Sequence, residues 1–155
     1  MKKVFIVLAL VLVMIVPLSA ASYMKTNGVG VGVSGGYPFS GAAFKYGMDD
    51  FRIVGTLGYN YGGGISVEAG AQYDVYQFDI GELPFYVNVG VTGSASFIFD
   101  DLKNIGVAAN VPVGLSYFFE QFPMEVFLKV APGVKILPSI GFDIGGALGA
   151  LWYFD

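Results

Sequence analysis

The sequence predicts an all-β protein: an eight-stranded antiparallel up-and-down transmembrane β-barrel that follows an N-terminal signal peptide. Three observations support this fold class: an unbroken apolar–polar alternation over residues 65–76, the repetition of that pattern along the chain, and a composition rich in apolar but poor in charged residues. Side chains of a strand alternate between its two faces, so the alternation indicates a strand. Its 12 residues match the roughly 9–11 that a tilted strand needs to cross a hydrocarbon layer.

Composition limits the possible functions. Hydrophobic residues make up 55% of the chain and charged residues 13%, about half the usual quarter and too few to cover a water-soluble domain. Cysteine and histidine are both absent, which excludes disulfides and thiolate metal sites and removes the commonest general base. We therefore expect a protein that is not an enzyme and that has no cofactor and no metal site.

Residues 1–21 have the pattern of a secretory signal peptide. Lys2 and Lys3 precede an apolar run over residues 4–16, and small residues follow, with cleavage expected after Ala20 or Ala21. The run of 13 residues is shorter than the roughly 18 that indicate a spanning helix. We expect residues 22–155 to form an exported barrel with 6 basic (8 − 2) and 12 acidic residues. That balance makes nucleic acid an unexpected partner.

Seven further segments repeat the strand pattern and bring the number of predicted strands to eight. Short turns are expected between most of them, with longer connections over residues 77–83, 97–104 and 132–141. Pro112 falls inside one strand and predicts a bulge or a break in its ladder of hydrogen bonds. The predicted strands cover residues 27–35, 40–48, 51–60, 65–76, 85–94, 105–119, 124–131 and 142–154.

The two faces of these strands differ in composition. One face is apolar, and the other carries small and polar residues with few charges. A soluble lipocalin-like barrel would expose the second face to water, where roughly 25–35% charged residues are expected. The membrane version, with the apolar face toward lipid, is the better fit. Aromatic residues near the strand ends would form interfacial girdles, namely Tyr59, Tyr61, Tyr117, Phe118, Phe119, Trp152 and Phe154.

Charged residues on the inward face nearly balance. A lone charge in a narrow, protein-filled lumen would carry a large desolvation cost, so we expect mutual ion pairs. The alternative is a selectivity or gating cluster in a narrow pore. The predicted charge network of the lumen consists of Lys45, Arg52, Glu68, Asp74, Glu125, Lys129 and Asp143.

The C-terminus carries a resemblance to a known family. Residues 149–154 look like the assembly signal of bacterial outer-membrane barrels, with Gly149 followed by Trp152 and Phe154. Residues 111–118, 122–127 and 130–133 also resemble small, largely uncharacterised outer-membrane proteins with OmpA/OmpX-like eight-stranded barrels. The resemblance implies an outer-membrane location, contact with outer-membrane lipids, and biogenesis through periplasmic chaperones and the barrel-assembly machinery. It implies no catalytic residues.

For function, we expect a structural or surface-interaction role with an unknown surface partner, using the connections 97–104 and 132–141. Three alternatives remain open. They are a narrow channel for ions or small solutes, a lipid-modifying barrel enzyme, and a soluble periplasmic lipocalin-like barrel that binds an apolar ligand.

Overall fold

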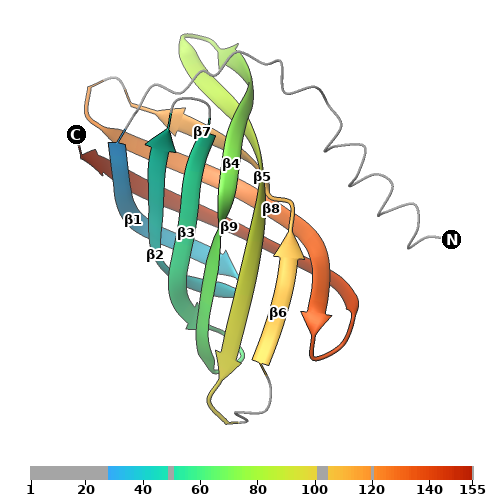
Figure 1. Ribbon diagram of the computed structural model, residues 1–155. Coiled ribbons are helices and arrows are strands. Elements are labelled where there is room, and N and C mark those ends of the chain that lie inside the picture. The colour runs from blue at the N-terminus through green and yellow to red at the C-terminus, as the bar shows by residue number, and fades with distance from the viewer. Residues whose placement is uncertain (1–27, 49–50, 101–104, 120, 155) are drawn as a thin grey trace, which may run out of the picture.

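The computed structural model describes residues 28–48, 51–100, 105–119 and 121–154, and these residues form nine β-strands and no helix (Figure 1). The predicted signal peptide lies outside the described residues, and so do Asp49 and Asp50, where the short turn between the second and third predicted strands is expected. The strands are β1 (Gly28–Tyr37), β2 (Phe39–Met48), β3 (Phe51–Asn60), β4 (Gly64–Ile80), β5 (Leu83–Ile98), β6 (Ile105–Asn110), β7 (Val113–Phe118), β8 (Met124–Leu137) and β9 (Gly141–Phe154).

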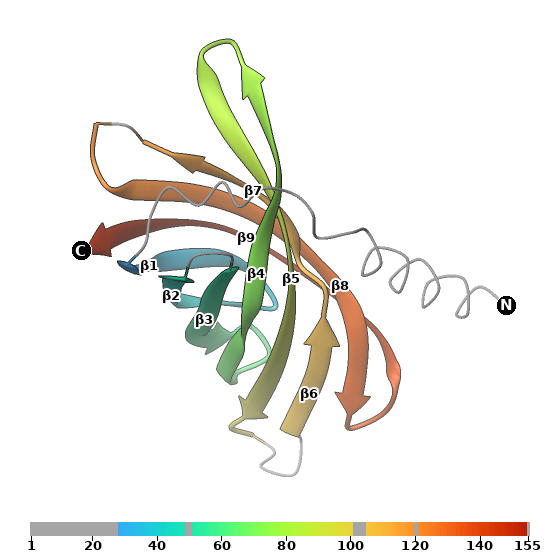
Figure 2. The ribbon, with the colours of Figure 1, turned by 45° about the horizontal axis from the view of Figure 1, so that its top comes forward.

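The strands form one antiparallel sheet that closes into a ring. Strands that follow one another in the chain pair around the sheet, except for β6 and β7, which do not pair with each other. β9 returns to pair with β1 from Val29 opposite Phe154 to Tyr37 opposite Gly146. Figure 2 shows the strands curving around a common centre. Closure leaves no free sheet edge, which is what a barrel achieves. The prediction of an all-β antiparallel ring is confirmed.

The strand predicted over residues 105–119 is two strands, β6 and β7, separated by Val111 and Pro112. Both pair with β5 on one side and β8 on the other, so together they occupy a single place in the ring. The ring therefore has eight places but nine strands in the described chain. Proline cannot donate to a ladder, and the predicted break at Pro112 is confirmed.

Two of the predicted long connections are wrong. Residues 77–83 belong mostly to β4 and β5, which continue to a turn at Gly81 and Glu82, where Gly81 has a φ of 66°. Residues 132–141 mostly extend β8. Pro132 is tolerated there because it lies opposite the break between β6 and β7, where its carbonyl accepts the N–H of Val111 at 2.8 Å. The backbone N–H that proline lacks would have pointed toward this same break, because the N–H and C=O of a residue in an antiparallel strand face the same neighbouring strand.

The ring has two distinct ends. The C-terminal rim holds the end of β9, the β4–β5 turn, Phe119 and residues 121–123. The opposite rim holds Pro38 and the turns at residues 61–63 and 138–140. The β4–β5 hairpin stands out beyond the neighbouring strands at the C-terminal rim in both views (Figures 1 and 2).

Burial in this ring is inverted relative to a water-soluble protein. Val33 is 67% exposed and Leu57 57% exposed on the outer face, whereas Arg52 and Glu125 are fully buried inside. Soluble proteins almost never bury Arg or Glu completely unless they are paired, and they rarely expose large continuous apolar surfaces. The buried polar and charged residues are Ser34, Lys45, Arg52, Asn60, Ser66, Glu68, Gln72, Asp74, Asn88, Thr92, Asn110, Ser116 and Glu125.

Aromatic residues line the outer face near both rims. At the C-terminal rim, seven rings form a continuous row from Tyr76 to Trp152 with centroid separations of 4.8–6.4 Å. Near the opposite rim, Tyr59 and Tyr61 are exposed. One predicted member is wrong: Phe118 is buried inside the ring, because it shares the inward face with Ser116. The row comprises Tyr76, Phe78, Phe85, Tyr117, Phe119, Phe122 and Trp152.

Candidate functional site

The interior near the C-terminal rim contains a buried charge cluster made of Lys45, Arg52, Asp74 and Glu125, contributed by β2, β3, β4 and β8. Glu125 accepts from Lys45 Nζ at 2.7 Å and from Arg52 Nη1 at 3.3 Å, while Arg52 Nη2 donates to Asp74. All four side chains are at most 6% exposed. Two cations and two carboxylates give the cluster a formal charge of zero, which is how buried charges are tolerated.

Neutral partners also contact this cluster, although Arg52 Nε and Asp74 Oδ2 are buried without a hydrogen-bond partner among the described residues. Ser116 donates to Glu125 at 2.6 Å, and the hydroxyl of Tyr153 donates to the other Glu125 oxygen. The Phe127 ring lies 4.4 Å from Lys45 Nζ, and the Phe118 ring 5.4 Å from the Arg52 guanidinium carbon, at cation–π separations. The charges and rings together fill the lumen at this level.

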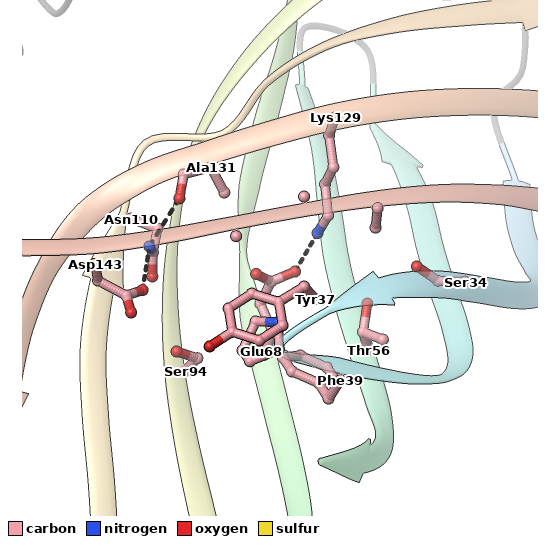
Figure 3. Close-up of a pocket in the computed structure, with 14 residues that line it drawn as sticks. Ser34, Tyr37, Phe39, Thr56, Glu68, Ser94, Asn110, Lys129, Ala131 and Asp143 are labelled. Atoms are coloured by element: carbon pink, nitrogen blue, oxygen red, sulfur yellow. Dashed lines mark hydrogen bonds and ion pairs between the residues drawn. The ribbon is translucent and has the colours of Figure 1, made fainter. Parts of the chain in front are cut away.

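A second ion pair lies on the side of the opposite rim. Lys129 of β8 donates to Glu68 of β4, and Thr92 of β5 donates to the same carboxylate at 3.5 Å. The Lys129 side chain is 20% exposed and that of Glu68 9%, so this pair is less enclosed than the buried charge cluster. Figure 3 shows the two side chains reaching toward each other across the interior.

Asp143, the seventh residue of the predicted network, makes no ion pair with any described residue. It instead accepts a hydrogen bond from Asn110 Nδ2 at 2.8 Å, and the same amide nitrogen donates to the Ala131 carbonyl at 3.1 Å (Figure 3). The structure thus brings six predicted residues into two groups of ion pairs and sets Asp143 apart.

Several interior residues were not predicted. Asn110, Ser116 and Tyr153 each contact a predicted charge, and a separate network joins Asn60 to Ser66 at 2.8 Å and Ser66 to Ser96 at 2.6 Å. Their position on the inward face was readable from the alternation. Their contacts were not, because a contact between different strands also depends on how each strand is shifted relative to its neighbours.

Cavities follow one another along the interior from the opposite rim. A cavity of about 270 Å³ lies at that rim and is lined by residues that include Asn60, Lys135 and Asp143. A cavity of about 30 Å³ surrounds the Glu68–Lys129 pair (Figure 3). Another of about 30 Å³ lies between Lys129 and Lys45. The spaces narrow toward the buried charge cluster.

The predicted assembly signal lies in β9. Trp152 and Phe154 point outward and are 45% and 56% exposed, and Trp152 ends the aromatic row. Gly149 faces inward, directly opposite Phe127 of β8. A Cβ at Gly149 would meet the Phe127 ring and would lie 2.6 Å from the Val33 carbonyl oxygen.

We expect Gly149→Val to destabilise the ring by about 1–3 kcal/mol, the usual cost of overpacking a filled interior. Urea unfolding followed by the fluorescence of Trp152 measures the effect. Gly93→Ala is the control, because nothing lies within 4 Å of a Cβ added there. Equal stability of the two variants would contradict the close packing of Phe127 over Gly149.

Comparison with known proteins adds no relative. No protein-family model matches the chain, and neither curated proteins nor solved structures gave a match. Among the described residues, no helix has the length and apolar character needed to cross a membrane. The described residues also contain no group of three or more side chains suited to hold a metal ion.

Proposed function

We propose that the protein is an integral outer-membrane β-barrel whose filled, charge-paired lumen serves a structural or surface-interaction role. One observation carries the proposal: the ring exposes its large apolar side chains outward and buries its charges inside. In water this arrangement would leave the apolar surface unfavourably exposed. Against lipid the same surface is well solvated, and closure of the ring satisfies the backbone hydrogen bonds that a bilayer cannot.

The girdles support the same orientation. Tyr and Trp prefer the membrane–water interface, and they flank the apolar band of outer-membrane barrels, which is about 25 Å tall. On β3, Phe51 and Tyr59 lie near opposite rims. The eight residues of rise between them cover about 26 Å along the strand at ~3.3 Å per residue, and less along the membrane normal because the strand is tilted.

The filled interior favours a structural or surface role over a wide pore. The buried charge cluster and the rings of Tyr86, Phe118 and Phe127 occupy the lumen near the C-terminal rim. Lipids of the outer membrane are then the main contacts of the outer face. The resemblance in the last strand supports delivery by periplasmic chaperones and insertion by the barrel-assembly machinery.

Fractionation of cells that express the protein tests the proposal. We expect it in the outer-membrane fraction, resistant to washing with urea or sodium carbonate and released only by detergent. Recovery in the soluble periplasmic fraction without detergent would refute the membrane assignment and favour the lipocalin-like alternative.

A second candidate, a narrow channel for ions or small solutes, is favoured by the succession of cavities separated by the Glu68–Lys129 pair. Single-channel recording in a planar bilayer separates the two candidates. We expect silence from a folded, inserted barrel, because the buried charge cluster blocks the lumen. Discrete openings that change in a Glu68→Gln, Lys129→Met variant would establish the channel instead.

A further inference from the structure

The cavity at the opposite rim combines features of a ligand site. Its volume is about 270 Å³, just below the roughly 300–1,000 Å³ of sites for drug-sized ligands, so an occupant would have about the size of one amino acid. Its lining includes polar side chains such as Ser94 and apolar ones such as Ile98, Val107 and Pro138. This mixture is typical of pockets in which a few polar groups orient a partly apolar ligand.

Two opposite charges lie side by side in its wall. Asp143 on β9 is opposite Gly133, and Lys135 on β8 is opposite Gly141, which makes the two side chains diagonal neighbours on one face. Diagonal neighbours are about 7–8 Å apart, within reach of long side chains. The two nevertheless form no ion pair with each other, and the Lys135 ammonium has no ion-pair partner among the described residues.

Asp143 is held in place by another contact. Asn110 donates to Asp143 Oδ2 at 2.8 Å and is itself fixed by the Ala131 carbonyl. The other carboxylate oxygen of Asp143, Oδ1, takes part in no hydrogen bond with a described residue. The site therefore offers an oriented carboxylate oxygen and an adjacent exposed lysine. A carboxylate that is already oriented loses less entropy on binding a cation.

From this juxtaposition we propose that the cavity binds a small zwitterion of the amino-acid type with an apolar side chain. The ligand's carboxylate contacts Lys135, its ammonium contacts Asp143, and its side chain packs near Ile98, Val107 and Pro138. Both contacts are charge-assisted hydrogen bonds, which are shorter and stronger than hydrogen bonds between neutral groups. The proposal does not depend on the membrane assignment, because the cavity lies inside the ring.

Isothermal titration of the purified, detergent-solubilised protein with L-leucine tests the proposal. Leucine amide keeps only the positive charge and 4-methylpentanoate only the negative charge, so the three probes isolate each contact. We expect leucine to bind saturably and each single-charge analogue to bind about tenfold more weakly or worse. Lys135→Met and Asp143→Asn should each weaken leucine binding by a similar factor.

The control variant is Glu82→Gln, which removes an exposed charge from the β4–β5 turn at the other rim and should leave leucine binding unchanged. Circular dichroism of each variant establishes that the strands are formed. Absence of saturable leucine binding by a folded barrel would overturn the proposal. So would leucine binding that survives both Lys135→Met and Asp143→Asn, or 4-methylpentanoate binding as tightly as leucine.

Discussion

Glu125→Gln is expected to destabilise the folded barrel by about 3–5 kcal/mol, the cost of leaving buried charge without its partner. Glu125 is fully buried and contacts Lys45, Arg52, Ser116 and Tyr153. Without its charge, two cations face the single carboxylate of Asp74, and the cluster carries a net positive charge in the interior. Urea unfolding in detergent micelles or vesicles, followed by the one tryptophan of the chain, measures the loss.

A double-mutant cycle separates charge imbalance from general damage. Lys45→Met combined with Glu125→Gln restores neutrality, since only Arg52 and Asp74 remain charged in the cluster. The double variant should therefore lose less stability than the sum of the two single variants. Additive losses would show that pairing does not hold the cluster together. Glu82→Gln, in an exposed turn, should change stability by less than about 0.5 kcal/mol.

Val91→Arg is expected to destabilise the membrane-inserted barrel by about 2–4 kcal/mol, the cost of a basic residue at the bilayer midplane. Val91 is 51% exposed on the outer face of β5, six residues from Phe85 and six from Phe97. It therefore lies halfway between two aromatic residues on the outer face of its strand, Phe85 and Phe97. Reversible unfolding from lipid vesicles measures the effect.

The matched control is Tyr61→Arg, at an exposed position near the opposite rim. Arginine costs only about 0–1 kcal/mol near the interface, so this variant should stay close to the parent. A soluble barrel gives a different result: Val91→Arg would then be neutral or would improve solubility. The difference in destabilisation between Val91→Arg and Tyr61→Arg therefore shows whether lipid contacts the outer face.

The alternation of side chains predicted much of the fold. It identified the faces of β2–β5 correctly as far as the bulge after Asp74, with Lys45, Arg52, Glu68 and Asp74 inward and residues such as Leu57 outward. It placed Tyr76 on the inward face, whereas Tyr76 is exposed. The errors arose where another feature was weighted above the alternation. Phe118 was grouped with the neighbouring aromatic residues. It follows Ser116 by two residues, so the alternation places its side chain on the same inward face.

Strand ends were harder to predict. The β-bulge between Asp74 and Tyr76 interrupts the alternation of β4, so the regular pattern stops there although the strand continues to Ile80. Pro132 was interpreted as the end of a strand. It lies opposite the break at Pro112 between the neighbouring strands, where the N–H that proline lacks is not needed for the ladder of hydrogen bonds. Such compensation is visible only once the strands are paired.

The sequence predicted which residues of the candidate site face inward, but it did not predict which of them lie at the same level along the axis of the ring. The sequence placed seven charges inside, yet it could not show that Glu125 meets Lys45 and Arg52, residues 80 and 73 positions away. Those contacts depend on the tilt and stagger with which the ring closes between β1 and β9. For the same reason, the neighbouring positions of Lys135 and Asp143 emerge only from the register of β8 and β9.

The central claim is that lipid contacts the outer face of the ring, and depth-dependent quenching tests it most directly. The chain has no cysteine, so single-cysteine variants at Val91 and Phe97 can each carry one fluorophore in lipid vesicles. We predict that the label at Val91 is quenched by lipids brominated near the chain ends and is shielded from aqueous iodide. The label at Phe97 should respond most to bromines near the headgroup. A label at Val91 that iodide quenches and brominated lipids do not would contradict the account.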